Sequence, residues 1–509
     1  MDTITRTIYS FMSPRLRAIK RYDKDAELLQ QLQLARVLRI LNGTQYKRSF
    51  CKEDIKNYEE FRKKIPVTEY EPLRPWVDKM LTGQKGQLLR KGCSHFAVSS
   101  GTSGGRSKYL PVPGLHLSGC HYKGASDALW LYLASRPDSQ FFKHKGLVIG
   151  GSHKPVNMGL GIRAGDLSAI LVENMPSLGR MFRTPSKETL LMDEWTSKMT
   201  AIANEVIKAD VGSLSGVPSW MLEMIKAVMD RTKVGNLSEL WPHLEVFFHG
   251  GISFDPYREK YKELIPSERM QYRETYNASE GFFAVQNDPL DKAMLLMLDY
   301  GIFYEFIPLS DFLEHGNESD QIIPLSQVVV GETYAMVIST LGGLYRYIIG
   351  DTIRFLSTHP YKIVIAGRTQ HYINAFGEEL MVHNANDALA QASSEFNCHV
   401  SEFSVAPYFL LDQAKGYHQW LVEFDTPPQD ISKFTSRLDE LLRQSNSDYD
   451  AKRYANMTLE PLRLEVARNG LFRQWLLKEG KLGGQHKVPR MKNDNTLMEL
   501  LLELNNQEW

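Results

Sequence analysis

Apolar, strand-like runs alternate with amphipathic segments along the first two thirds of the chain. The strand-like runs are HFAVSS at 95–100, GLVIG at 146–150, HLEVFFHGG at 243–251 and AMVIST at 335–340. Between them lie segments with helical periodicity, such as 193–208 and 219–230. This alternation is typical of an α/β fold, and we expect a largely parallel sheet covered by helices.

A long helix is predicted near the N-terminus, over residues 22–41. Its expected apolar face carries Leu28, Leu32, Ala35, Leu38 and Leu41, which are spaced three or four apart. The preceding stretch is basic, with Arg6, Arg15, Arg17, Lys20, Arg21 and a single early acid, Asp2. Such a start resembles a transit peptide, but its continuation into a long helix favours a solvated lead-in to a packed helix.

The pattern changes toward the C-terminus. Strand-like WLVEF at 420–424 precedes a helix at 431–443, a second strand at 463–467 and another helix near 471–478. An α+β unit of about 140 residues has the size of a small domain. We place the boundary at 366–370, where an apolar strand meets a polar stretch, which predicts a large domain at 1–366 and a smaller one at 367–509.

Charge and cysteine content exclude some classes of partner. Lysine plus arginine and aspartate plus glutamate both number 60, so no net field attracts nucleic acid or an anionic membrane. No apolar run reaches the roughly 18 residues of a membrane span. Cys51, Cys93, Cys120 and Cys398 lie far apart in sequence, which fits a reducing compartment. We expect a soluble, cytoplasmic protein.

The run SSGTSGGRSK at 99–108 directly follows the first predicted strand. Its glycines allow the backbone to approach a phosphate, its hydroxyls and N–H groups can donate to phosphate oxygens, and Lys108 can neutralise their charge. The segment therefore predicts a phosphate-binding loop. A flexible surface loop of the same composition is the ordinary alternative.

The residues that come after this run argue against two better-known loops. A Walker loop and the G-x-S-x-G nucleophile elbow, which Gly101–Gly105 matches, both lead into a helix. Here Pro111 and Pro113 come immediately after, and prolines at these positions leave no room for that helix. A serine hydrolase is therefore the weaker alternative.

Three further segments carry candidate nucleotide contacts. In YNASEG at 276–281, the Tyr276 ring can stack on a base and Glu280 offers the oxygen ligand that Mg²⁺ prefers, while Gly250 and Gly251 end a strand upstream. In YRYIIGD at 345–351, Asp351 can accept hydrogen bonds from ribose hydroxyls. In GGQHKVPR at 483–490, Lys487 lies in a glycine-hinged loop. Each is common alone, but the set in this order favours an adenylating enzyme.

These four segments resemble the acyl-acid amido synthetases of the Gretchen Hagen three family. This auxin-responsive family comprises plant hormone-conjugating enzymes and their bacterial relatives, within the adenylate-forming superfamily of acyl-CoA synthetases and luciferase. The likeness runs through nearly the whole chain and includes IPVT at 65–68 and GVPSW at 216–220. It implies a large α/β adenylation domain of that superfamily's type and a small α+β domain that moves about a hinge.

The resemblance also implies roles for single residues. Ser99, Ser100, Thr102, Ser103 and Lys108 would hold the ATP phosphates, and Glu280 would face Mg²⁺ or the α-phosphate. Tyr276, Gly250 and Gly251 would border adenine, Asp351 would hold the ribose, and Arg368 would lie at the hinge. Lys108, Glu280 and Lys487 would be the catalytic residues. Ala278 departs from the serine or threonine that the family often has, which removes one hydroxyl.

The implied reaction uses ATP and Mg²⁺ to adenylate a small carboxylic acid and transfers the acyl group to an amine, which we expect to be an amino acid. An acyl-CoA ligase shares the adenylation step, but its motif usually closes with Lys-Gly, whereas this chain has Lys108-Tyr109. A nucleotide sensor that has lost its chemistry is the other alternative.

Overall fold

The computed structural model describes residues 1–99, 107–150, 156–192, 195–251, 254, 257–368, 372–378, 380–410, 415–454, 458–478 and 488–506. The chain divides into two compact units. The larger unit contains residues 1–99, 108–251 and 261–369, and the smaller contains 370–509 with the short segments 100–107 and 252–260. The apolar strand at the expected boundary, β16, runs over Tyr361–Arg368.

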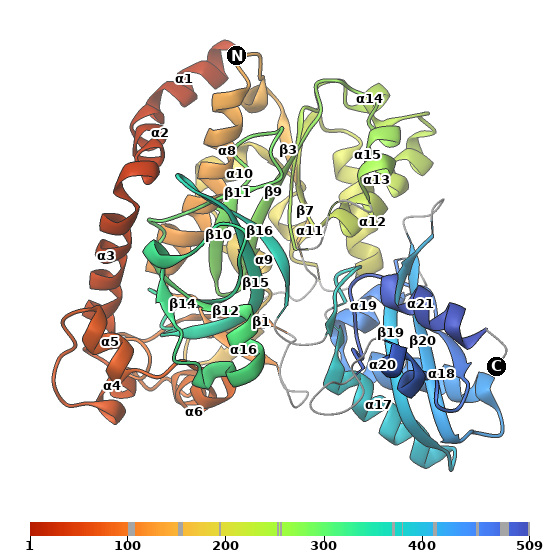
Figure 1. The fold of residues 1–509 in the computed structure, drawn as a ribbon. Coiled ribbons are helices and arrows are strands. Elements are labelled where there is room, and N and C mark those ends of the chain that lie inside the picture. The colour runs from red at the N-terminus through yellow and green to blue at the C-terminus, as the bar shows by residue number, and fades with distance from the viewer. Residues whose placement is uncertain are drawn as a thin grey trace. The chain divides into compact units, whose positions relative to one another are not determined.

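A 12-stranded sheet is the centre of the larger unit (Figure 1). Its strands, in spatial order, are β13 (Ile323–Pro324), β12 (Ile302–Pro308), β14 (Thr333–Thr340), β15 (Tyr347–Thr358), β16, β11 (Met294–Leu296), β10 (Gly281–Val285), β9 (Gln271–Ala278), β8 (Val246–His249), β7 (Val211–Gly216), β3 (Lys145–Val148) and β6 (Arg183–Thr184). A second, four-stranded sheet has the order β2 (Lys108–Pro111), β1 (His95–Ser99), β5 (Ile162–Gly165) and β4 (Val156–Gly159).

The large sheet is mixed, which corrects the expectation of a largely parallel one. Strands β6, β3, β7, β8 and β9 run parallel, whereas the described strands from β9 through β10, β11, β16, β15, β14 and β12 to β13 pair antiparallel. Short connections account for several of the antiparallel pairs. A short turn such as that between β9 and β10 permits only an antiparallel pair, whereas a parallel pair needs a crossover of a dozen or more residues.

Most of the predicted elements are present. The long N-terminal helix is α3 (Tyr22–Leu41), and the two amphipathic segments are α12 (Trp195–Val206) and α13 (Pro218–Thr232). Further helices among residues 1–369 include α1 (Thr3–Phe11), α2 (Ser13–Lys20), α4 (Gln45–Phe50), α5 (Tyr58–Lys64), α6 (Tyr70–Leu81), α7 (Gly114–His116), the π-helix η1 (Leu117–Tyr122), α8 (Lys123–Ser135), α9 (Leu167–Glu173), α10 (Ser177–Met181), α11 (Lys187–Leu190), α14 (Leu237–Leu240), α15 (Arg258–Leu264) and α16 (Leu309–His315). No helix in the described ranges is long and apolar enough to span a bilayer.

The buried face of α3 differs from the predicted one. Leu28 and Leu32 are 53% and 51% exposed, whereas Gln30 and Gln33 are buried. Gln30 donates to the carbonyls of Leu298 and Ile302 and accepts from the Tyr304 amide, and Gln33 accepts from the Gly301 amide. Buried backbone groups must find hydrogen-bond partners. Two glutamines therefore face the sheet, while two of the leucines face away from it.

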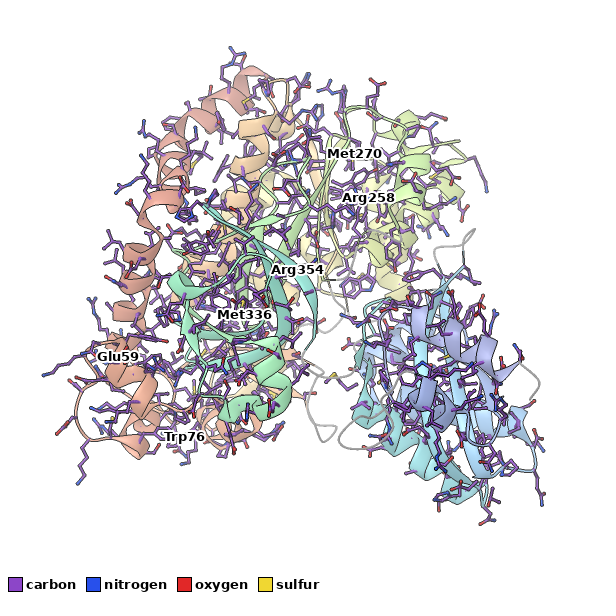
Figure 2. The ribbon with its side chains drawn as sticks, viewed as in Figure 1. Glu59, Trp76, Arg258, Met270, Met336 and Arg354 are labelled. Carbon is purple, nitrogen blue, oxygen red and sulfur yellow. The ribbon has the colours of Figure 1, made fainter. Side chains whose placement is uncertain are left out.

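A buried ion pair joins the N-terminal helices to the sheet. Arg346 and Glu305 are 3% and 1% exposed, and their side chains meet at 2.9 Å. The guanidinium also donates to the carbonyls of Arg62 and Ile65 at 2.8 Å, at the end of α5. The carboxylate accepts from the Tyr58 hydroxyl at 3.1 Å. Figure 2 labels Met336, a fully buried residue of β14.

The smaller unit is an α+β arrangement, as the sequence predicts. Its main sheet has the order β19 (His399–Phe409), β20 (Gly416–Thr426) and β21 (Arg463–Ala467), with β20 and β21 parallel. The helices are α17 (Val382–Glu395), α18 (Ile431–Ser445), α19 (Ser447–Arg453), α20 (Leu471–Lys478) and α21 (Thr496–Asn505), and β17 (Tyr372–Ile373) pairs with β18 (Leu380–Met381). Trp420 and Phe403 stack at 5.7 Å within its core.

Removing the carboxylate of Glu305 should destabilise the larger unit strongly. Glu305→Ala would leave the Arg346 guanidinium buried without its counter-charge, which typically costs about 3–5 kcal/mol. Urea denaturation would measure this loss. The matched control is Arg21→Ala, because Arg21 pairs with Asp25 at 2.6 Å on the surface of the same unit, where such a pair contributes about 1 kcal/mol at most. Equal effects of the two substitutions would contradict a structural role for the buried pair.

Candidate active site

The parallel strands place several loops at one edge of the large sheet. Residues after the ends of β3, β7, β8 and β9 all leave the sheet at its carboxyl edge, because these strands pair parallel with one another. In open α/β sheets, ligands bind beyond the carboxyl ends of the strands. Gly250 and Gly251 come after β8, and the turn that contains Glu280 comes after β9, so the fold brings these predicted residues to the same edge.

Gly250 is required by a close approach of two backbone segments. A Cβ atom built on Gly250 would lie 2.3 Å from the carbonyl oxygen of Thr275, which is closer than any atoms can pack. The Thr275 hydroxyl donates to the His249 carbonyl at 3.1 Å and fixes this contact. Gly251 has a φ of +85°, which L-residues with a side chain rarely adopt. The end of β8 therefore offers bare backbone on this edge of the sheet.

Tyr276 and Asp351 form a direct hydrogen bond. The Tyr276 hydroxyl donates to Oδ2 of Asp351 at 2.6 Å, and the two residues are 5% and 7% exposed. Both lie within strands, Tyr276 in β9 and Asp351 in β15. Gly350, with φ of +92°, precedes Asp351 inside the strand, so the glycine alters the strand's course without ending it. The predicted adenine and ribose residues are thus in contact.

Lys108 lies near the start of the same strand. Its Nζ is 3.4 Å from the hydroxyl of Tyr347, the first residue of β15, and 6.0 Å from the centre of the Tyr70 ring. The Tyr70 hydroxyl in turn accepts from the Tyr109 amide at 2.7 Å. Sequence reasoning missed both tyrosines, although Tyr347 belongs to the YRYIIGD segment. The two rings give the lysine a defined position.

Ser99 and Lys108 are directly opposed in an antiparallel pair formed by β1 and β2. The two ends of the predicted phosphate loop are therefore held side by side. Lys108 begins a strand and not a helix, as the argument against a Walker loop and a nucleophile elbow predicts. Ser100, Thr102 and Ser103 lie outside the described residues, and their predicted roles stay predictions.

A buried histidine contacts the backbone carbonyl of Glu280. Glu280 is 8% exposed, and its carbonyl oxygen lies 3.0 Å from Nε2 of His116, which is 2% exposed. Burial lowers the pKa of His116 to about 4, so the ring is neutral at physiological pH. Because a carbonyl can only accept, Nε2 carries the ring proton. The Cys120 thiol on η1 accepts from the amide of Phe282, the second residue of β10, at 3.1 Å. No sequence motif pointed to either residue.

Of the two remaining predicted residues, only the backbone of Arg368 is located. The backbone of Arg368 pairs with that of Asp351 across β15 and β16, whereas its side chain is outside the described part of the chain. Lys487 is also outside the described residues. Arg346, in the middle of the YRYIIGD segment, is committed to the buried pair with Glu305 and is structural.

Comparison with known proteins gives three family matches along the chain. The model of the GH3 family N-terminal domain matches residues 15–270, that of the central domain 295–368 and that of the C-terminal domain 383–496. An indole-3-acetic acid-amido synthetase of Arabidopsis thaliana, GH3.3, is 22% identical over 96% of this chain and 93% of its own length. The 4-substituted benzoates-glutamate ligase GH3.12 of the same plant is 21% identical over 87% and 89%.

Two kinds of solved structure share the fold. The AtGH3.15 acyl acid amido synthetase in complex with 2,4-DB superposes with a TM-score of 0.61 at 18% identity, covering 96% of this chain and 95% of that one. A 2-hydroxyisobutyryl-CoA ligase in complex with 2-HIB-AMP and CoA gives a TM-score of 0.55 at 14% identity, covering 96% and 92%. The described architecture is therefore that of GH3 proteins and adenylate-forming ligases.

Substitution of Gly250 should disturb the end of β8. Gly250→Ala forces a methyl group against the Thr275 carbonyl, and overpacking of this kind costs about 1–3 kcal/mol. Faster hydrogen exchange in β8 and β9, with a lower urea midpoint, would register the change. Gly119→Ala is the control, since its Cβ would meet no atom within 4 Å and should shift stability by about 1 kcal/mol at most. If Gly250→Ala changed neither the hydrogen exchange nor the urea midpoint, the close approach of Gly250 to Thr275 would be refuted.

Proposed function

Since this chain belongs to the GH3 family, we propose that it is an ATP-dependent acyl-acid amido synthetase. It adenylates a small carboxylic acid, releases pyrophosphate and transfers the acyl group to the amine of an amino acid. The curated relatives with which it aligns are amido synthetases of indole-3-acetic acid and a benzoate-glutamate ligase. A free acid and an amino acid are therefore the substrate classes to test first, and the cytoplasm is the expected location.

One observation supports the proposal above the others. Lys108 meets Tyr347 at the start of β15, and Asp351 of the same strand meets Tyr276 of β9. Lys108 as the cation for phosphate, Asp351 as the carboxylate for ribose and the aromatic Tyr276 are thus connected through β15 in the larger unit. The donor set fits a magnesium nucleotide, because Glu280 adds a carboxylate and Mg²⁺ prefers such oxygen ligands.

In the first half-reaction the site must position and neutralise charge, since the attacking group is the substrate's own carboxylate. Its oxygen attacks the α-phosphorus, the bond from that phosphorus to the bridging oxygen breaks, and pyrophosphate leaves with the electron pair. Lys108 would offset the charge of the phosphates and Asp351 would orient the ribose. Mg²⁺ held by Glu280 would supply further charge neutralisation. Lys487 would add a second cation.

In the second half-reaction the amine nitrogen attacks the acyl carbon. The amide bond forms, AMP leaves, and the amine gives up its proton. Exclusion of water favours the amine over hydrolysis of the reactive anhydride. The chemistry needs no protein nucleophile, in line with a site built from cations, carboxylates and backbone.

The competing proposal is an acyl-CoA ligase, which the likeness to the 2-hydroxyisobutyryl-CoA ligase fold keeps open. Carboxylate-dependent ATP–pyrophosphate exchange over a panel of aryl and alkyl acids tests the shared adenylation step. Each active acid is then offered mixed amino acids or CoA, and the products are identified by mass. An amide supports the proposal and a thioester replaces it. ATP binding without exchange on any acid would favour a nucleotide sensor.

Loss of the Lys108 amine should slow adenylation. Lys108→Ala is expected to lower the exchange rate about a hundredfold or more, by analogy with removal of one group that stabilises transition-state charge. Lys91→Ala is the control, because Lys91 is exposed just before β1 in the same unit. An unchanged exchange rate in Lys108→Ala, with Lys91→Ala also unchanged, would remove Lys108 from the mechanism.

The Tyr276 hydroxyl should act through Asp351. Tyr276→Phe keeps the ring for stacking but removes the donor, so ATP affinity should fall only if the hydroxyl positions the carboxylate. Affinities of Tyr276→Phe, Asp351→Asn and the double variant form a thermodynamic cycle, and non-additive losses are expected because the two groups touch. Tyr334→Phe, a buried tyrosine of β14, is the control. Strictly additive losses would show that Tyr276 and Asp351 act independently.

A further inference from the structure

Three potential metal ligands meet in the larger unit, away from the predicted nucleotide residues. One nitrogen each from His144 and His243 and one carboxylate oxygen of Asp210 lie within 4.8 Å of one another. Nδ1 of His144 is 2.7 Å from Oδ2 of Asp210, and the two imidazole rings stack at 4.3 Å with an angle of 16° between their planes. His144 is buried, whereas Asp210 and His243 are exposed.

The parallel strands bring these residues together. His144 immediately precedes β3, Asp210 immediately precedes β7, and His243 lies three positions before β8. Because β3, β7 and β8 are neighbours that run in the same direction, their amino ends meet at the edge opposite Gly250 and Gly251. The length of β7, six residues, separates the two edges by roughly 20 Å. This cluster is therefore distinct from the proposed ATP site.

The position of His144 is tightly fixed. A Cβ on Gly212 would lie 2.8 Å from Cβ of His144, so only a glycine fits beneath this histidine. In the part of the chain that the structure describes, Nε2 of His144 is buried and has no hydrogen-bond partner. A buried polar atom without a partner costs free energy, which the hydrogen bond to Asp210 through the other nitrogen does not recover. Nδ1, the nitrogen that meets Asp210, is the one that an ion bound by both side chains would contact, and Nε2 lies on the far side of the ring.

The donor set selects the class of ion. Two imidazoles and one carboxylate suit Zn²⁺ and similar divalent transition metals, whereas Mg²⁺ and Ca²⁺ prefer ligands that are all oxygen. Zinc takes nitrogen and oxygen ligands at about 2.0–2.2 Å in tetrahedral geometry, which sets ligand atoms roughly 3.4 Å apart. The 2.7 Å pair of His144 and Asp210 must therefore open slightly, and any wider pair must close from its present limit of 4.8 Å. The exposed side chains of Asp210 and His243 can rotate onto an ion held at the fixed His144. A fourth position would stay open to water.

We propose that His144, Asp210 and His243 form a binding site for a divalent transition-metal ion of the zinc type, at the amino edge of the large sheet. The site joins three strands through their preceding loops, so an ion there would stabilise the larger unit. This proposal is independent of the proposed amido synthetase activity, since it uses other residues and another class of ion.

The test is a calorimetric titration of the full chain, freed of metal with a chelator, with ZnCl₂. We expect one equivalent to bind to the wild type and to raise its melting temperature. His243→Ala and Asp210→Asn change exposed side chains and should leave the fold intact, as circular dichroism can verify. Losing even an outer partner of a metal ligand typically costs 10–100-fold in affinity, so each substitution should weaken this Zn²⁺ binding by about tenfold or more.

His399→Ala is the matched control. His399 and Asp425 also meet at 2.7 Å through Nδ1 and Oδ2, but among the described residues no third ligand joins them. The variant should bind Zn²⁺ like the wild type. The proposal would be overturned if the wild type took up no stoichiometric Zn²⁺, or if binding survived unchanged in both His243→Ala and Asp210→Asn.

Discussion

The common direction of strands β3, β7, β8 and β9 is the constraint on which the candidate sites depend. Parallel neighbours place all their carboxyl ends at one edge of a sheet and all their amino ends at the other. The carboxyl edge holds Gly250, Gly251 and the turn of Glu280. The amino edge collects His144, Asp210 and His243. One topological fact therefore gathers two separate sets of candidate ligand-binding residues.

The antiparallel half of the sheet contributes the remaining candidate side chains, through strand β15. β15 carries Tyr347, which meets Lys108, and Asp351, which meets Tyr276 of β9. This strand also comes directly after Arg346, whose buried pair with Glu305 fixes its start. Breaking a buried pair costs several kcal/mol, so the start of β15 is held firmly. A rigid support of this kind suits a reaction that relies on positioning and charge rather than on a protein nucleophile.

Much of the fold and of the candidate site could be predicted because the signals are local in sequence. The periodicity of residues 22–41 and of 219–230 marks helices that the structure contains as α3 and α13. The glycine- and hydroxyl-rich run before Lys108 sits between two short apolar segments, and these are the paired strands β1 and β2. Such features depend on neighbours along the chain, which the sequence displays directly.

Long-range pairing, in contrast, was decided only by the tertiary structure. Gln30 and Gln33 are buried because distant backbone groups near Leu298–Tyr304 need partners, and no periodicity within α3 reveals that need. In the same way, Tyr276 and Asp351 are 75 positions apart in the chain yet share a hydrogen bond. The sequence by itself determined which segments form strands and which short motifs resemble an adenylating enzyme. Strand order and direction determined which side chains meet, because contact between distant residues depends on packing rather than on spacing.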